Sequence, residues 1–184
     1  MNLKPSIISL CIFVTALGTT IGASATPIFN SATGHYYDTL GAGGKTWTDS
    51  EAAATSIAAG AHLVTINDAI EQAWLVSTFG SSSKFWIGFN DAASEGNFVW
   101  VSGEMPGYIN WSTGEPNNNG GAENYAVMNW GNPGQWNDLS NSYLALAIVE
   151  WAPTKVDVPE PGILALFGFG LAGLVFTRRR MQGA

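Results

Sequence analysis

The sequence predicts an α+β fold in which two helices come first and a small antiparallel sheet with one long loop follows. Three observations predict it. Helix-capping residues occur in the first half, short apolar runs typical of strands dominate the second half, and about twenty residues without regular pattern interrupt those runs. At 184 residues, with 46% apolar and 12% aromatic content, the chain suffices for one packed domain.

The first helix is expected to begin near residue 48. Thr48-Asp49-Ser50-Glu51 has the pattern of a capping box, in which the glutamate bonds back to the start of the helix. The alanines that follow favour helix, and Gly60 is its expected end.

The second helix is expected to begin with Asn67 or Asp68 as its cap and to stop at Gly80. Helical spacing predicts one face formed by Ile70, Trp74 and Ser77. Short apolar runs elsewhere predict strands near residues 35–37, 63–66, 85–89, 98–101, 125–128, 135–138 and 144–151.

The charge of the chain argues against nucleic acid as a partner. Residues 26–157 hold 13 Asp or Glu against 3 Lys, a formal balance of −10. Such a surface repels phosphate backbones and attracts cations.

The N-terminal 25 residues have the pattern of a secretory signal peptide. Lys4 is followed by an apolar run and by Ala23-Ser24-Ala25, a small-residue cleavage site. The single cysteine, Cys11, lies inside this segment, so the exported chain would have no disulfide. A domain over residues 26–152 and a linker over 153–157 are expected to follow.

The C-terminal residues 158–184 combine Pro159-Glu160-Pro161, a short apolar segment at 163–177 and three arginines. This combination resembles the PEP-CTERM sorting signal of Gram-negative bacteria that make exopolysaccharide. The resemblance implies processing by an exosortase and transient membrane anchoring. A permanent single-pass anchor is the alternative, although the segment is shorter than the ~20 residues of a comfortable membrane helix.

Acids and amides recur at fixed offsets between residues 114 and 138. Their side-chain oxygens are the hard ligands that Ca²⁺ prefers, and together they carry a formal charge of −3. Pro116 stiffens the turn, and its X-Pro bond is a candidate for the cis form. The set of expected calcium ligands is Glu115, Asn117, Glu123, Asn137 and Asp138.

Five motifs, in order and spacing, resemble the C-type lectin-like domain over residues 35–151. They are Trp86-Ile87-Gly88, Glu115-Pro116-Asn117, Glu123, Trp136-Asn137-Asp138 and Ile148-Val149-Glu150-Trp151. The resemblance implies a double-loop domain in which Ca²⁺ in the long loop bridges the five ligands to sugar hydroxyls. The Glu-Pro-Asn order implies mannose- or glucose-type sugars. Asp91, Glu95 and Asn124 are similar to an auxiliary calcium site of the family.

The sequence departs from the family at its disulfides, because Tyr125, Asn141 and Val149 stand where the family has cysteines. The expected function is that of an exported, calcium-dependent carbohydrate-binding protein of the cell envelope or extracellular matrix, with exopolysaccharide or surface glycan as its target. An enzyme is not expected, since the acids interleave with amides and no nucleophile has a base partner. The alternative is a structural or protein-binding matrix protein of the same fold, in which calcium only stabilises the loop.

Overall fold

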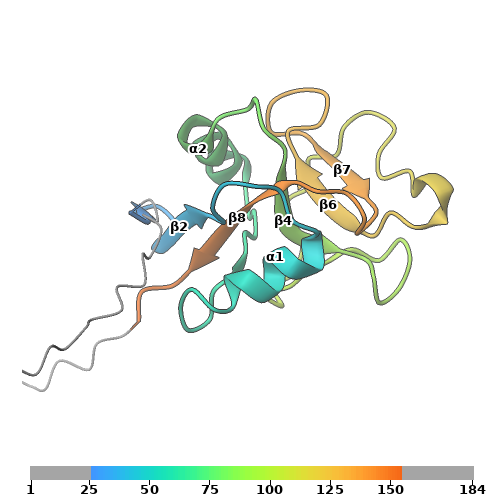
Figure 1. Ribbon diagram of the computed structural model, residues 1–184. Coiled ribbons are helices and arrows are strands. Elements are labelled where there is room, and N and C mark those ends of the chain that lie inside the picture. The colour runs from blue at the N-terminus through green and yellow to red at the C-terminus, as the bar shows by residue number, and fades with distance from the viewer. Residues whose placement is uncertain (1–25, 155–184) are drawn as a thin grey trace, which may run out of the picture.

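The computed structural model describes residues 26–154 and confirms the α+β class (Figure 1). Two helices pack on a mixed sheet, and irregular loops extend from the side of the sheet farther from β2. The elements in chain order are β1 (Ile28–Asn30), β2 (His35–Thr39), α1 (Trp47–Ala54), β3 (His62–Leu63), α2 (Ala69–Phe79), β4 (Phe85–Asn90), β5 (Val99–Trp100), the short 3-10 turn η1 (Asn119–Gly121), β6 (Tyr125–Met128), β7 (Trp136–Leu139) and β8 (Leu146–Trp151).

Helix α1 begins and ends earlier than expected. Its cap is Thr46, whose side chain accepts a hydrogen bond from the Asp49 N–H, so the predicted capping box at residue 48 is wrong. Glu51 instead accepts from the backbone N–H of Leu63, at 2.8 Å. The helix stops at Ala54 rather than Gly60. The hydroxyl of Ser56 bonds back to the carbonyl of Ala53, a contact that competes with helix extension.

Helix α2 has the expected ends but a different buried face. Asp68 caps the first turn and Gly80, with a φ of 84°, closes the last. The buried residues are Glu71, Gln72 and Leu75, whereas Ile70 is 76% exposed. Hydrophobic spacing could not show this, because polar side chains are buried here through hydrogen bonds to distant elements.

The strands form one sheet in the order β1-β2-β8-β4-β6-β7, with β3 added on β8 and β5 on β4. The expected antiparallel pairing holds everywhere except between β4 and β8, which run parallel. The last strand, β8, lies in the middle of the sheet between β2 and β4. As a result, β1 and the C-terminal end of β8 lie at the same end of the domain (Figure 1).

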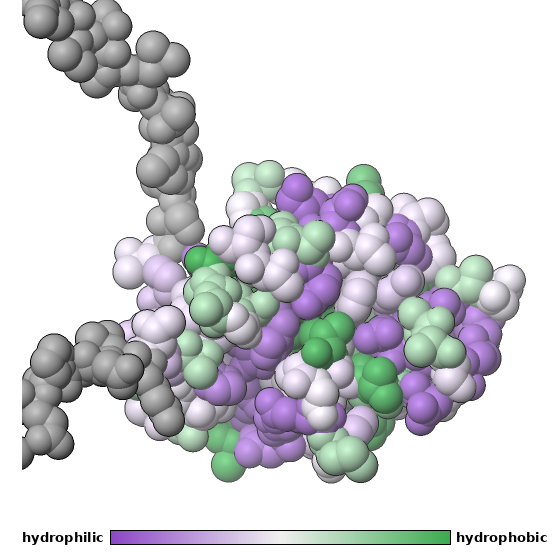
Figure 2. Space-filling view, turned by 90° about the horizontal axis from the view of Figure 1, so that it is seen from below, coloured by the Kyte–Doolittle hydropathy of each residue, from purple (hydrophilic) through white to green (hydrophobic). Residues whose placement is uncertain are grey.

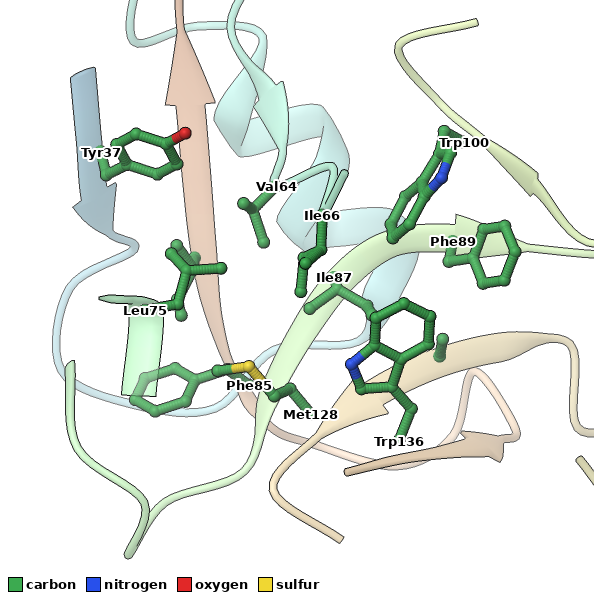
Figure 3. Packing of buried hydrophobic residues seen from close by; sticks show 12 residues of the cluster. Tyr37, Val64, Ile66, Leu75, Phe85, Ile87, Phe89, Trp100, Met128 and Trp136 are labelled. Atoms are coloured by element: carbon green, nitrogen blue, oxygen red, sulfur yellow. The ribbon is translucent and has the colours of Figure 1, made fainter. Parts of the chain in front are cut away.

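The core consists of two clusters. One surrounds Trp136 beneath α2 and includes Phe89 and Trp100 (Figure 3). The other lies beneath α1 and includes Trp47 and Trp86, whose indole N–H groups donate to backbone carbonyls. On the α1 side of the surface, hydrophobic residues are scattered among hydrophilic ones (Figure 2).

Tyr125, Asn141 and Val149, which stand where the C-type lectin-like domain is expected to have cysteines, make other contacts in this structure. Val149 is fully buried in the cluster beneath α1. Tyr125 packs against the Trp47 ring at 4.7 Å between centroids. The side chain of Asn141 forms two hydrogen bonds with Thr48. Its oxygen accepts from the backbone N–H of Thr48, and its N–H₂ group donates to the Thr48 hydroxyl. Packing and hydrogen bonds therefore join α1 to the sheet without a disulfide.

Several expectations concern segments outside the described residues. These are the signal peptide at 1–25, the sorting residues 159–161 and the apolar segment at 163–177. Within residues 26–154, none of the helices combines the length and the apolar character needed to cross a membrane.

Candidate functional site

The loop between β5 and β6, residues 101–124, is the long loop, and its tip is tied to strand β7. The carboxylate of Asp138 accepts hydrogen bonds from the backbone N–H groups of Asn117, at 3.0 Å, and Asn118, at 2.8 Å. The Glu115–Pro116 peptide bond between these contacts and the rest of the loop is cis. Asp138 is 1% exposed, so a buried carboxylate holds the Glu-Pro-Asn turn in place.

A second set of contacts closes the loop on itself. Glu123 accepts a hydrogen bond from the Asn119 N–H at 2.9 Å, and its own N–H donates to the side-chain oxygen of Asn118 at 3.1 Å. Asn118 has a φ of 44°, a left-handed conformation that asparagine tolerates better than most residues. Asn118 was not among the predicted site residues, although a run of three asparagines before a glycine pair, at residues 117–121, is typical of such a turn.

Two buried oxygens of the predicted ligand set have no hydrogen-bond partner within residues 26–154. They are Oε2 of Glu115 and Oδ1 of Asn137. Buried polar atoms are nearly always paired, so an unpaired carboxylate oxygen and amide oxygen in one region call for a ligand. Oxygens of these two kinds are suited to a hard cation such as Ca²⁺.

The electrostatics of the loop also favour a cation. Burial raises the pKa of Glu115, and the charges of Asp138 and Glu123 raise it further. Burial likewise raises the pKa of Glu123. No lysine or arginine of the described chain forms an ion pair with these acids. The three carboxylates therefore repel one another without a resident counter-charge.

The ligand set is not a ready-made metal cage. No group of three or more His, Cys, Asp or Glu side chains in residues 26–154 is arranged to hold a metal ion. The carboxylates of Asp138 and Glu123 are bonded to backbone N–H groups of the loop. The residues fit a cation because their side chains offer carboxylate and amide oxygens, two of which are unpaired. Cation binding would draw the carboxylates of Asp138 and Glu123 partly away from the loop backbone.

The residues of the expected second site are only partly brought together. The backbone N–H of Asp91 donates to the carbonyl of Asn124 at 3.1 Å, which places these two residues side by side. Asp91 is buried, and its Oδ1 has no partner within residues 26–154. Glu95 is exposed, and its side chain makes no hydrogen bond to the described residues.

Asn137 and Asp138 are positioned by a rigid strand. Both lie on β7, which pairs with β6 over four residues. Trp136, immediately before them, is fully buried, and its backbone bonds to Asn110 and Ser112 of the long loop. Trp111 of the long loop packs against Phe98 with ring centroids 4.8 Å apart.

The sequence has relatives among known proteins. Residues 43–149 match the lectin C-type domain family, and residues 157–180 match the PEP-CTERM protein-sorting motif. The low affinity immunoglobulin epsilon Fc receptor of Mus musculus is 38% identical over 120 residues, which are 65% of this chain and 34% of that protein. A lectin of Pleurodeles waltl is 34% identical over 121 residues, 64% of this chain and 70% of that one.

The fold has solved relatives as well. The carbohydrate-recognition domain of cow CD23, solved in the presence of a GlcNAc2Man3 oligosaccharide, is 29% identical and superimposes with a TM-score of 0.62. The match covers 72% of this chain and 99% of that domain. From the sequence match and the shared fold, we conclude that this chain belongs to the C-type lectin domain family.

Proposed function

We propose that this protein is exported and binds carbohydrate through a calcium ion in its long loop. The ligands would be Glu115, Asn117, Glu123, Asn137 and Asp138. The observation that carries the proposal is the pair of buried, unpaired oxygens on Glu115 and Asn137, two residues of this set. Auxiliary calcium at Asp91, Glu95 and Asn124 is a further part of the proposal, supported by the unpaired Oδ1 of Asp91.

The chemistry of the site suits a sugar. Bound calcium would supply a positive charge that attracts sugar hydroxyls into its coordination shell. Asn117 and Asn137 each offer an amide N–H₂ group as a donor, and Glu115 and Glu123 offer carboxylates as acceptors. A hydroxyl both donates and accepts, so these side chains would orient it with charge-assisted hydrogen bonds. Recognition would depend on the geometry of neighbouring hydroxyls.

Mannose- or glucose-type sugars are the proposed ligands. The Glu115-Pro116-Asn117 order supports this choice, and the cow CD23 domain was solved with a mannose-containing oligosaccharide. The natural target would be exopolysaccharide or a surface glycan. Catalysis is not part of the proposal, because the acids of the site are arranged as ligands among amides.

The proposed organisation of the chain follows from the sorting motif at 157–180. Residues 1–25 would be removed as a signal peptide, and residues 26–152 would form the lectin domain. Residues 153–157 would link it to the sorting signal at 158–184. The apolar segment at 163–177 would anchor the protein transiently, until an exosortase processes it near residues 159–161, in the envelope of a Gram-negative bacterium.

A glycan array, probed once with calcium and once with EDTA, tests the proposal. We expect signals on mannose- or glucose-type glycans that EDTA strongly reduces. Equal signals in both conditions would overturn calcium dependence. A rise in thermal stability on adding calcium, without any glycan signal, would instead give calcium a purely loop-stabilising role in a structural or protein-binding protein.

A further inference from the structure

A surface hollow of about 140 Å³ lies between the β1–β2 hairpin and the first two turns of α2. These elements lie at the opposite end of the domain from the turn η1 of the long loop (Figure 1). The residues that matter in its lining are Asn30, Thr33, Asp68, Ile70, Glu71 and Trp74. None of them belongs to the proposed calcium sites.

Asn30 leaves one hydrogen-bond donor free at this hollow. Its side chain is held in one orientation because Oδ1 accepts from the Ala32 N–H at 2.9 Å. Asn30 is 6% exposed, and its Nδ2 makes no hydrogen bond to the rest of residues 26–154. Asn30 itself lines the hollow. A nearly buried side chain with an unused donor indicates a ligand that accepts.

Acidic side chains provide acceptors at the same hollow. Oδ1 of Asp68 accepts the N–H groups of Ile70 and Glu71, and Oδ2 has no partner among the described residues. Glu71 is 4% exposed. It is fixed by the Tyr37 hydroxyl at 2.7 Å and by the Asn67 N–H at 2.9 Å. Both carboxylates are therefore held in position before any ligand arrives.

The remaining wall is apolar and aromatic. Trp74 is half-buried and is held between the rings of Tyr37, at 4.9 Å, and Phe79, at 6.2 Å. Ile70 stands beside it with 76% of its surface exposed. A fixed aromatic ring beside polar groups can pack against the C–H groups of a ligand while the polar groups take its hydrogen bonds.

The three features together select the chemical class of the ligand. A ligand must accept from Asn30, donate to Asp68 and cover an apolar ring. Hydroxyl groups on a carbon ring do all three, whereas an ammonium group has no acceptor and would meet the N–H₂ group of Asn30. Anionic groups would be repelled by Asp68 and Glu71.

We propose that this hollow is a second carbohydrate subsite, independent of calcium, that takes one neutral sugar unit. It does not rest on the calcium site, because it uses none of the same residues. Two weak sites at opposite ends of one domain would hold a polysaccharide long enough to reach both more tightly than either site alone, or would link two neighbouring polysaccharide chains.

The test is an NMR titration of the ¹⁵N-labelled protein in EDTA, which removes any contribution from calcium. The probes are trisaccharides of mannose, of glucose and of N-acetylglucosamine, with trigalacturonate as the anionic comparison. We expect at least one neutral probe to shift the Trp74 indole resonance, assigned with Trp74→Phe, and trigalacturonate to leave it unmoved. Ile70→Arg, which fills the hollow, and Asn30→Asp, which replaces the donor by an acceptor, should each weaken binding about tenfold or more.

Ile57→Arg is the matched control, because Ile57 is 42% exposed after α1 and does not line the hollow. It should bind like the wild type. Absence of any Trp74 shift with all three neutral probes would overturn the proposal. So would equal binding by Ile70→Arg, or equal shifts with trigalacturonate. Failure of the calcium site would appear separately, as an EDTA-insensitive glycan array, and leaves this titration unaffected.

Discussion

The indole N–H of Trp136 donates a 2.7 Å hydrogen bond to the side-chain oxygen of Gln72 on α2. Gln72 is 5% exposed, and its N–H₂ group donates to the sulfur of Met128 on β6. One buried amide thus joins α2 to both strands of the β6–β7 pair. Because Asn137 and Asp138 directly follow Trp136, this contact positions the two proposed ligands that the long loop does not supply.

Replacing Gln72 by methionine should therefore destabilise the domain. The substitution preserves the approximate volume but leaves the buried Trp136 indole N–H without an acceptor, at a cost of about 1–3 kcal/mol. Urea unfolding of the variant and the wild type measures the difference. Thr78→Met, a substitution on the same helix at a half-buried position with no side-chain hydrogen bond to the described residues, is the comparison. A Gln72→Met loss no larger than that of Thr78→Met would contradict the role given to the amide.

Gly88 of the Trp-Ile-Gly motif should not tolerate a side chain. A methyl group there would lie 2.5 Å from the backbone oxygen of Leu63 and 2.7 Å from a side-chain carbon of Val101. We expect Gly88→Ala to lower the free energy of unfolding by about 1–3 kcal/mol or more, as overpacked cores do. Gly107→Ala, in the long loop with no atom within 4 Å of the added carbon, should change it little. Equal stability of the two variants in urea unfolding would refute the steric explanation.

His35 should make the stability of the domain depend on pH. A hydrogen bond from the ring to buried Glu150, at 2.9 Å, raises the pKa of His35 above its usual 6.5, and burial opposes this rise only in part. The charges of Glu150, Glu104 and Glu71 act in the same direction as the hydrogen bond. Since folded His35 holds its proton more tightly than the unfolded chain does, its contribution is full below pH 6.5 and is lost as pH rises through the folded pKa.

Chemical unfolding at pH 6 and at pH 8.5 measures this effect. The wild type should lose more stability between about pH 6 and about pH 8.5 than His35→Gln, which cannot titrate. An identical loss in the two proteins would show that the His35–Glu150 contact does not contribute.

Sugar choice should follow the order of the ligands. Exchanging them through Glu115→Gln together with Asn117→Asp preserves the formal charge of the site, so calcium binding should persist. It also exchanges a carboxylate and an amide at the hydroxyl-binding positions, and we expect preference to move toward galactose-type sugars. Competition by free mannose and free galactose measures this. Unchanged preference would mean that the loop does not read the sugar hydroxyls.

Local rules predicted some of this structure well. Asp68 and Gly80 end α2 as expected, because capping depends on residues within one turn. The strand at Tyr125–Met128 also lies where its apolar run predicted it. The same rules did not predict features that depend on contacts between residues far apart in the sequence. Glu71 and Gln72 are buried by partners 34 and 64 residues away, and no period within α2 reveals those partners. The parallel pairing of β4 with β8 likewise depends on the course of the whole chain.

The residues of the candidate site could be proposed from the sequence, whereas the hydrogen bonds that they form in the structure could not. Glu115, Asn117 and Asp138 stand out by type and spacing, and the structure links Asp138 to the backbone of Asn117. The bond from Glu123 to Asn118 depends on a left-handed turn that spacing does not fix. No sequence motif predicts the hollow beside α2, because its polar groups come from a hairpin and a helix that meet only in the folded chain.

Calorimetric titration with calcium tests the central claim most directly. The wild type should bind calcium, and Glu115→Gln alone should bind it more weakly because a ligand charge is lost. Glu104→Gln, an exposed acid of the same loop outside the ligand set, should bind like the wild type. Absence of binding by the wild type up to about 10 mM, above the ~10⁻⁴–10⁻³ M range of extracellular calcium modules, would contradict the account.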